Sequence, residues 1–315
     1  MRNPLRTWFG RVVRGRTDGR VRAVWRVLVP VLAGFITLQL AGATAFALGL
    51  NTGQMMVASF VATTLVMLLA LGLSARYLDR RPVRAYGFNL SRDWWLDLVG
   101  GTVIGSLVVA LTFVVGQQTG GLRVTGSLSL GGTSPGWLLA FLVAFVGVAL
   151  YEEFIYRGAF VTNTIEGLSE RGVNPRVAAA GALLASTLAF AAIHLPGALA
   201  AGANPGLVVA KTGLLGGLLG VAYLRTGELA LPMGLHLGVN YSLLNVFGIG
   251  TEGLAGVPSL LAVEVTATGL WSPARGLPLF GSIATGYVLL FGWLRWRQAD
   301  GPARSSETST PTTSD

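Results

Sequence analysis

Long apolar stretches separated by short polar connections dominate the chain. The first runs without a charged residue from Val27 to Ala75, and Asn51-Thr52-Gly53-Gln54 divides it into two spans. Each has roughly 20 residues, the length that crosses a bilayer as a helix. Six further stretches follow, at about 94–118, 137–161, 177–200 (with Pro196-Gly197 as an interruption), 205–224, 229–247 and 277–294. The pattern predicts an all-α, polytopic membrane protein with about eight transmembrane helices.

The arginines set the expected orientation. Eight arginines lie within residues 1–26, and further basic residues follow the second, fourth, sixth and eighth spans. Basic residues concentrate on the cytoplasmic side of membrane proteins, so we expect both termini in the cytoplasm. The placement of this charge favours anionic lipid headgroups as partners and argues against nucleic acid.

The chain divides into three parts. Residues 1–26 are expected to form a basic cytoplasmic or interfacial arm, 27–297 the eight-span membrane domain, and 298–315 a disordered polar tail. The apolar segment 248–276 carries Glu252, Pro258, Glu264 and Pro273. We interpret it as an external or re-entrant segment and not as a crossing.

Composition supports this assignment and excludes other classes. Hydrophobic residues make up 52% of the 315 residues and charged residues 12%, about half the charge usual in a soluble domain. Cysteine is absent and histidine occurs twice. These values exclude a disulfide-rich domain, a cysteine-based zinc finger and a cysteine nucleophile. We expect an integral, multi-pass protein of the cell membrane.

Ionisable and amide groups inside the spans are the candidate functional residues, because a charge in the hydrocarbon costs about 2.5–3.5 kcal/mol. The fourth span carries Tyr-Glu-Glu-Phe-Ile-Tyr-Arg, the fifth Phe-Ala-Ala-Ile-His, and the seventh His-Leu-Gly-Val-Asn. Side chains four apart share a helix face, so Glu153 can pair with Arg157. The candidates are Glu152, Glu153, Arg157, His194, His236 and Asn240.

Each candidate also has a structural explanation. Glu152 and Glu153 fit a solvated helix end, and Arg157 fits a side chain that extends to the headgroups. A histidine or an asparagine in a span can simply connect helices by hydrogen bonds. The three motifs together are harder to explain in this way than any one alone.

Glu-Glu-x-x-x-Arg, Phe-x-x-x-His and His-x-x-x-Asn, in this order on three spans, resemble the CPBP family, also called the ABI family. That family includes the type II CAAX prenyl proteases and the bacteriocin-processing or self-immunity proteins. The motifs cover residues 152–240. The resemblance implies an intramembrane glutamic endopeptidase with a catalytic core at 137–248, no cofactor, and a membrane-associated peptide or protein as substrate.

The resemblance also implies a role for each residue. Glu152 would be the general base on a water, which His194 would help to hold and polarise. His236 and Asn240 would form an oxyanion hole, and Glu153 with Arg157 would support them. General-base chemistry requires a carboxylate within hydrogen-bond reach of the water, and an oxyanion requires aligned donors.

The depth of His194 poses a geometric difficulty. If the fifth span entered the membrane at Arg176, the rise of about 1.5 Å per residue would place His194 deeper than Glu152 and His236. We therefore expect the first turns of that helix, near 177–181, to project into the cytoplasm. A large separation of His194 from Glu152 would contradict the proposed site.

Three other interpretations remain open on the sequence. The same fold could serve a non-enzymatic membrane immunity or scaffold protein. Buried ionisable groups are also found in secondary transporters, although the chain shows no inverted repeat. Glutamate and histidine are also zinc ligands, so a zinc-dependent version of the protease is a further alternative, although no His-Glu-x-x-His motif is present.

Overall fold

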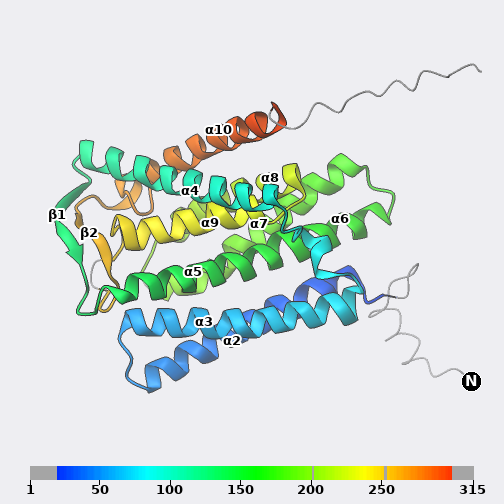
Figure 1. Cartoon of the computed structure of the whole chain (residues 1–315), viewed down its shortest axis with the longest axis horizontal. Helices are drawn as coiled ribbons and strands as arrows, with labels where there is room; N and C mark the ends of the chain where they lie inside the picture. Colours follow the sequence, from blue (N-terminus) through cyan, green and yellow to red (C-terminus); the bar gives the residue numbers. More distant parts are fainter. Residues whose placement is uncertain (1–19, 201, 252–253, 300–315) are drawn as a thin grey trace, which may run out of the picture.

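The protein is a bundle of long helices that run roughly side by side (Figure 1). The computed structural model describes residues 20–200, 202–251 and 254–299. Both ends of the described chain lie at one end of the bundle, and a two-stranded sheet closes the other end (Figure 1). The predicted tail and most of the predicted basic arm, residues 300–315 and 1–19, lie outside the described residues.

Within the described residues, seven helices are long and apolar enough to cross a membrane. The predicted seventh span forms a shorter helix, α9, whose 12 residues continue into the five residues of η4. The predicted polytopic all-α class is therefore confirmed. The helices are α2 Ala23–Ala47, α3 Thr52–Leu73, η1 Ser74–Asp79, η2 Val83–Tyr86, α4 Arg92–Gln118, α5 Gly136–Glu153, η3 Phe154–Val161, α6 Thr162–Ser169, α7 Pro175–Ala200, α8 Pro205–Thr226, α9 Ala230–Tyr241, η4 Ser242–Val246, η5 Gly269–Trp271 and α10 Leu277–Ala299.

The predicted break between the first two spans is confirmed at α3. Asn51 Oδ1 accepts from the backbone N–H of Gln54 at 2.9 Å, and Gln54 Oε1 accepts from the backbone N–H of Asn51 at 3.1 Å. This reciprocal capping box satisfies backbone groups that a helix start leaves unpaired.

Helix α9 is enclosed by its neighbours, which explains how a short helix can occupy the centre of the bundle. Gly101 and Gly105 of α4 face Gly234 and Gly238 of α9. A Cβ on Gly101 would lie 2.4 Å from the Leu231 carbonyl oxygen. The lack of side chains at these positions lets the two backbones approach closely, as small residues do in membrane helix pairs.

Two predicted boundaries were wrong. The fourth span does not end near residue 161, because α5, η3 and α6 form one continuous helix of 34 residues, Gly136–Ser169. Pro196 does not interrupt the fifth span, because α7 continues to Ala200. A proline removes one backbone hydrogen bond and crowds the carbonyl four residues earlier, and in the last turns of a helix that loss is small.

The connection 117–136 contains a strand that the sequence did not indicate. β1, Leu122–Ser129, pairs antiparallel with β2, Ser259–Val265, and a register irregularity lies between Val124 and Gly126. Segment 248–276 therefore supplies a strand and, in its described part, no membrane-length helix, as expected. The cytoplasmic placement of the termini stays a prediction.

Candidate active site

The candidate site has Glu153 at its centre. Glu153 is the last residue of α5, and its side chain is fully buried. Its Oε1 accepts from His236 Nδ1 at 2.8 Å and from Arg157 Nη1 at 3.2 Å. The predicted pairing of Glu153 with Arg157 is present in this geometry, and it includes His236 from a helix 83 positions further along the chain.

Arg157 joins this centre to a third helix. It lies on the π-helical segment η3 and is also fully buried. Its Nη2 donates to the Gly216 carbonyl of α8 at 2.9 Å. A buried guanidinium needs such acceptors, because an unpaired buried charge is strongly destabilising. Local π-helical turns are frequent at functional sites.

Glu152 has a different environment from its neighbour. Its side chain is 15% exposed, and its Oε2 lies 3.8 Å from His236 Nε2. This separation exceeds a direct hydrogen bond. The Glu152 Oε2 atom is buried and has no hydrogen-bond partner within the described part of the chain.

The partners of His236 fix the orientation of its ring. A carboxylate can only accept, so Nδ1 carries a proton toward Glu153, at 2.8 Å. In the neutral ring Nε2 then offers a lone pair on the side of Glu152. A second proton would turn Nε2 into a donor.

His194 joins the site through an aromatic ring. Its Nδ1 donates to the Phe190 backbone carbonyl at 2.7 Å. The Phe190 ring lies 4.6 Å from the His194 ring and 5.9 Å from the His236 ring, between centroids. The Arg157 guanidinium lies 4.6 Å from the same ring centre. Phe190 therefore connects His194 to the glutamate cluster, which we define as Glu152, Glu153, Arg157 and His236.

The arrangement of α6 and α7 explains how His194 reaches this level. Because α5 continues through η3 into α6, the first turns of α7 pack beside α6 (Figure 1). Further along α7, the Ser186 hydroxyl donates to the Tyr156 carbonyl of η3 at 2.7 Å. Phe190 and His194 follow one and two turns later. The projection of the first turns of α7 into the cytoplasm stays a prediction.

Asn240 is the predicted site residue with the fewest contacts to the other site residues among those described. It lies one helical turn after His236 on α9 and is half-buried. Residues four apart share a helix face, so the amide and the imidazole lie on the same side of α9. Among the described residues, Asn240 has no hydrogen-bond partner of its own, and its predicted role stays a prediction.

Two contributors to the site were not predicted from the sequence. The Gly216 carbonyl accepts from Arg157, and the Phe190 ring contacts both histidines. A row of glycines on α8 was the available signal for close packing there. In residues 20–199, 202–251 and 254–299, no group of three or more histidine, aspartate and glutamate side chains is arranged to hold a metal ion.

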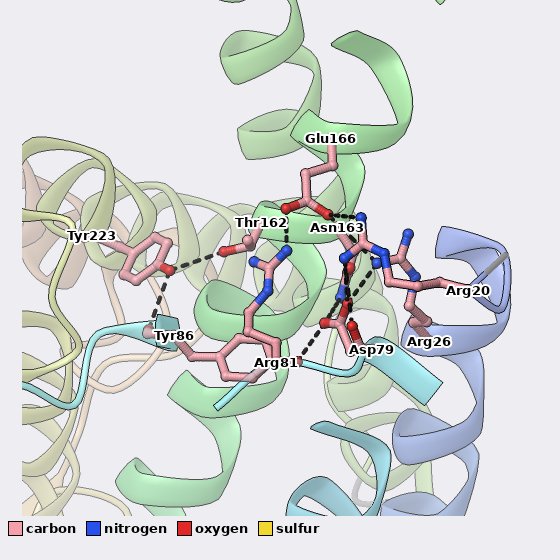
Figure 2. Close-up of polar contacts among 9 residues, drawn as sticks. All are labelled: Arg20, Arg26, Asp79, Arg81, Tyr86, Thr162, Asn163, Glu166 and Tyr223. Carbon is pink, nitrogen blue, oxygen red and sulfur yellow. Dashed lines mark hydrogen bonds and ion pairs between the residues drawn. The ribbon is translucent and has the colours of Figure 1, made fainter. Parts of the chain in front are cut away.

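A second buried polar cluster lies outside the predicted site (Figure 2). Its centre is Asp79, the last residue of η1, whose side chain is 1% exposed. Asp79 Oδ1 accepts from Arg26 and, at 3.3 Å, from Arg20. Its Oδ2 accepts from the Tyr86 hydroxyl and, at 3.1 Å, from Asn163 Nδ2. Both carboxylate oxygens are therefore paired.

Neighbouring groups extend this second cluster. Glu166 accepts from Arg81, and the Tyr223 hydroxyl lies 3.0 Å from Thr162 Oγ1 and donates to the Tyr86 backbone carbonyl at 3.2 Å (Figure 2). Burial and the Asp79 carboxylate raise the pKa of the Tyr86 hydroxyl well above its ordinary value, so Tyr86 remains a donor. We call Asp79, its four partners, Arg81, Glu166, Thr162 and Tyr223 the Asp79 cluster.

Comparison with known proteins adds independent information on the glutamate cluster. A family model described as Type II CAAX prenyl endopeptidase Rce1-like matches residues 134–242. This segment of the chain is similar to that family, and the match supports a CAAX-protease-like relationship. It contains all six predicted site residues and the four helices that carry them. No curated protein and no solved structure matches the chain.

The family match and the fold agree on the class of protein. The family is an integral membrane family, and the described chain has seven helices of membrane-spanning length. The protein is therefore a multi-pass integral membrane protein, and the match indicates a function of the CAAX-protease type.

Proposed function

We propose that the protein is an intramembrane glutamate-dependent endopeptidase that hydrolyses a peptide bond in a membrane-associated protein or peptide. The observation that carries this proposal is the contrast between two adjacent carboxylates. Glu153 is fully buried and bonded to His236 and Arg157. Glu152 keeps a free oxygen beside His236 Nε2 and is partly exposed.

This contrast supports Glu152 as the general base. A general base has to reach a water and accept its proton, and Glu152 has both an accessible side chain and an oxygen without a competing donor. Glu153 Oε1 already accepts from two donors, and although Glu153 Oε2 is unpaired, the whole side chain is buried, whereas that of Glu152 is 15% exposed. Glu153 and Arg157 are therefore positioning residues that hold the His236 ring.

The hydrolysis follows from these positions. Glu152 takes one proton from a water while the water oxygen bonds to the carbonyl carbon of the substrate. The carbonyl oxygen becomes an oxyanion, which His236, protonated on Nε2, and Asn240 Nδ2 stabilise by hydrogen bonds. The C–N bond then breaks, and Glu152 returns its proton to the leaving amine. His194, held by its bond to the Phe190 carbonyl, presents Nε2 to the water.

The substrate class is inferred from the family match. The matching family is described as a prenyl endopeptidase that acts on CAAX sequences, so a farnesylated CAAX peptide is the first probe. Neither the sequence nor the described residues show a group that recognises the prenyl chain specifically. The unmodified peptide is therefore a necessary second probe.

The experiment compares wild type with Glu152→Gln and with Glu170→Gln, an exposed glutamate at the end of α6. Purified proteins in lipid nanodiscs are assayed with internally quenched CAAX peptides, farnesylated and unmodified. We expect Glu152→Gln to lose about 10²–10⁴-fold in turnover and Glu170→Gln to match wild type. Equal turnover by wild type and Glu152→Gln would overturn the proposal.

A second arm covers substrates outside the two peptides. Membrane proteomics of cells that express wild type or Glu152→Gln should show a full-length protein that accumulates only with the variant. If no membrane protein differs in abundance or length between the two cell lines and neither peptide is cut, the result would favour a non-enzymatic scaffold protein. Loss of peptidase activity with a chelator, restored by zinc, would favour the zinc-dependent version.

A further inference from the structure

An arginine-lined cavity lies at the end of α3 and η1, away from the glutamate cluster. It has a volume of about 520 Å³ and is partly open to the surface. The cavity is lined by both apolar atoms and arginine side chains. The lining residues are Gly72, Ala75, Arg76, Arg80, Arg81, Pro82 and Val83.

Two of the three arginines of this cavity have no carboxylate partner among the described residues. Arg81 pairs with Glu166, and its guanidinium also lies 5.5 Å from the centre of the Tyr86 ring. Arg76 and Arg80 are exposed, and neither has a carboxylate partner among the described residues. Two cations thus remain available to an anion at the mouth of the cavity.

The backbone here is held in place by the Asp79 cluster. Asp79 closes η1 and is fixed by Arg26, Tyr86 and Asn163 (Figure 2). Arg80 follows in the left-handed region at φ 52°, and the Arg81 N–H donates to the Ala75 carbonyl at 2.8 Å. A left-handed conformation is unfavourable for a residue with a side chain. Such strain is found at ligand-binding positions that their surroundings hold firmly.

An exposed apolar row leads along α3 to the cavity. Leu65, Leu69 and Leu73 are 66%, 64% and 47% exposed, and their spacing of four places them on one helix face. They belong to a helix long and apolar enough to cross a membrane. An acyl chain packed along this row would bring its phosphate to the arginines at its end.

We propose that this cavity binds the phosphate of an anionic membrane phospholipid, with Arg76 and Arg80 as the phosphate ligands. A guanidinium is suited to phosphate by its charge and its planar set of donors. The apolar row favours a lipid over a soluble anion. The proposal is independent of the peptidase activity, because none of its residues belongs to the glutamate cluster.

The test uses phosphatidylglycerol as probe. Wild type, Arg76→Gln/Arg80→Gln and the control Arg84→Gln/Arg92→Gln are purified from mixed phosphatidylcholine and phosphatidylglycerol vesicles, and bound lipid is counted by native mass spectrometry. Arg84 and Arg92 are exposed and lie in the same basic stretch but outside the cavity. We expect a several-fold loss of bound phosphatidylglycerol in the first variant only.

Three results would overturn the proposal. Equal losses in the two double variants would show general attraction to the anionic surface. No preference of wild type for phosphatidylglycerol over phosphatidylcholine would exclude the site. Stabilisation of detergent-solubilised wild type by inorganic phosphate as large as that by phosphatidylglycerol would indicate a soluble anion. Because all four arginines are exposed, thermal unfolding should confirm that each variant folds.

Discussion

The glutamate cluster and the Asp79 cluster are made of the same kinds of groups, but their carboxylates are hydrogen-bonded to different degrees. Among the described residues each cluster also has other buried atoms without a partner, Arg157 Nε in the first and Arg26 Nε and Asn163 Oδ1 in the second. Each places a buried carboxylate against arginine and an aromatic ring. In the Asp79 cluster both carboxylate oxygens have donors. In the glutamate cluster, by contrast, Oε2 of Glu152 and Oε2 of Glu153 are buried without a partner among the described residues.

This difference distinguishes a structural cluster from a candidate reactive one. Leaving a buried acceptor unpaired costs about 1–3 kcal/mol, so native proteins keep few such groups. A site that binds water and substrate needs unpaired acceptors, and these lower the stability of the unliganded protein. We therefore expect substitutions in the Asp79 cluster to affect folding first and those in the glutamate cluster to affect turnover first.

The largest expected effect is on stability, from Asp79→Asn. The change removes the nearer charged partner of Arg26, whose side chain is 4% exposed, and leaves it only the longer contact with Glu166 Oε2 at 3.5 Å. Breaking a buried pair typically costs about 3–5 kcal/mol. Denaturant unfolding in nanodiscs should show this loss, while Glu152→Gln should unfold like wild type. The control is Asp93→Asn, because Asp93 is 73% exposed in its pair with Arg297. A stable Asp79→Asn would remove the distinction between the clusters.

A large effect on catalysis alone is expected for Asn240→Ala. If Asn240 donates to the oxyanion, its removal should lower kcat by about 10²–10³-fold and leave KM nearly unchanged. Its amide has no partner in the described part of the chain, so the free energy of unfolding should hardly change. Steady-state kinetics on the cleaved probe peptide provide the measurement. An unchanged kcat would exclude Asn240 from the oxyanion hole.

The smallest expected effect comes from Gly216→Ala. A Cβ at Gly216 would lie 3.1 Å from the Phe190 ring and 3.5 Å from Arg157 Nη2, whereas nothing lies within 4 Å of a Cβ at Gly213. Crowding should make Gly216→Ala about 1 kcal/mol less stable than the matched Gly213→Ala on the same helix, and turnover should fall slightly through Phe190. Equal stability of the two variants would contradict the close packing at Gly216.

Much of the fold could be predicted because lipid imposes simple requirements. A spanning segment has to be apolar, long enough and helical, so the spans can be recognised in the sequence. Asn51 and Gln54 are residues typical of a helix start. The extension of α5 into α6 was missed because the residues after 161 are polar. The β1–β2 pair was missed because pairing across more than a hundred residues leaves no local pattern.

The sequence predicted which residues belong to the candidate site and one pair among them, but not the contacts between helices. Glu153 and Arg157 could be paired from their spacing, because four residues make about one helical turn. The bond of Glu153 to His236, the Gly216 carbonyl and the ring of Phe190 come from other helices and depend on how these pack. The Asp79 cluster was not predicted, because its partners are drawn from segments separated by up to 146 positions.

The sequence by itself determined that the chain is a helical membrane protein and which few polar residues its spans retain, because burial in lipid excludes nearly all others. The tertiary structure gave the two glutamates their different surroundings. Their side chains point about 100° apart around the helix, so Glu153 meets His236 and Arg157 in the interior, while the Glu152 side chain is partly exposed and has an unpaired oxygen. Hydropathy identifies the polar residues of the site, and the packing of the helices decides how exposed each one is and which groups it bonds to.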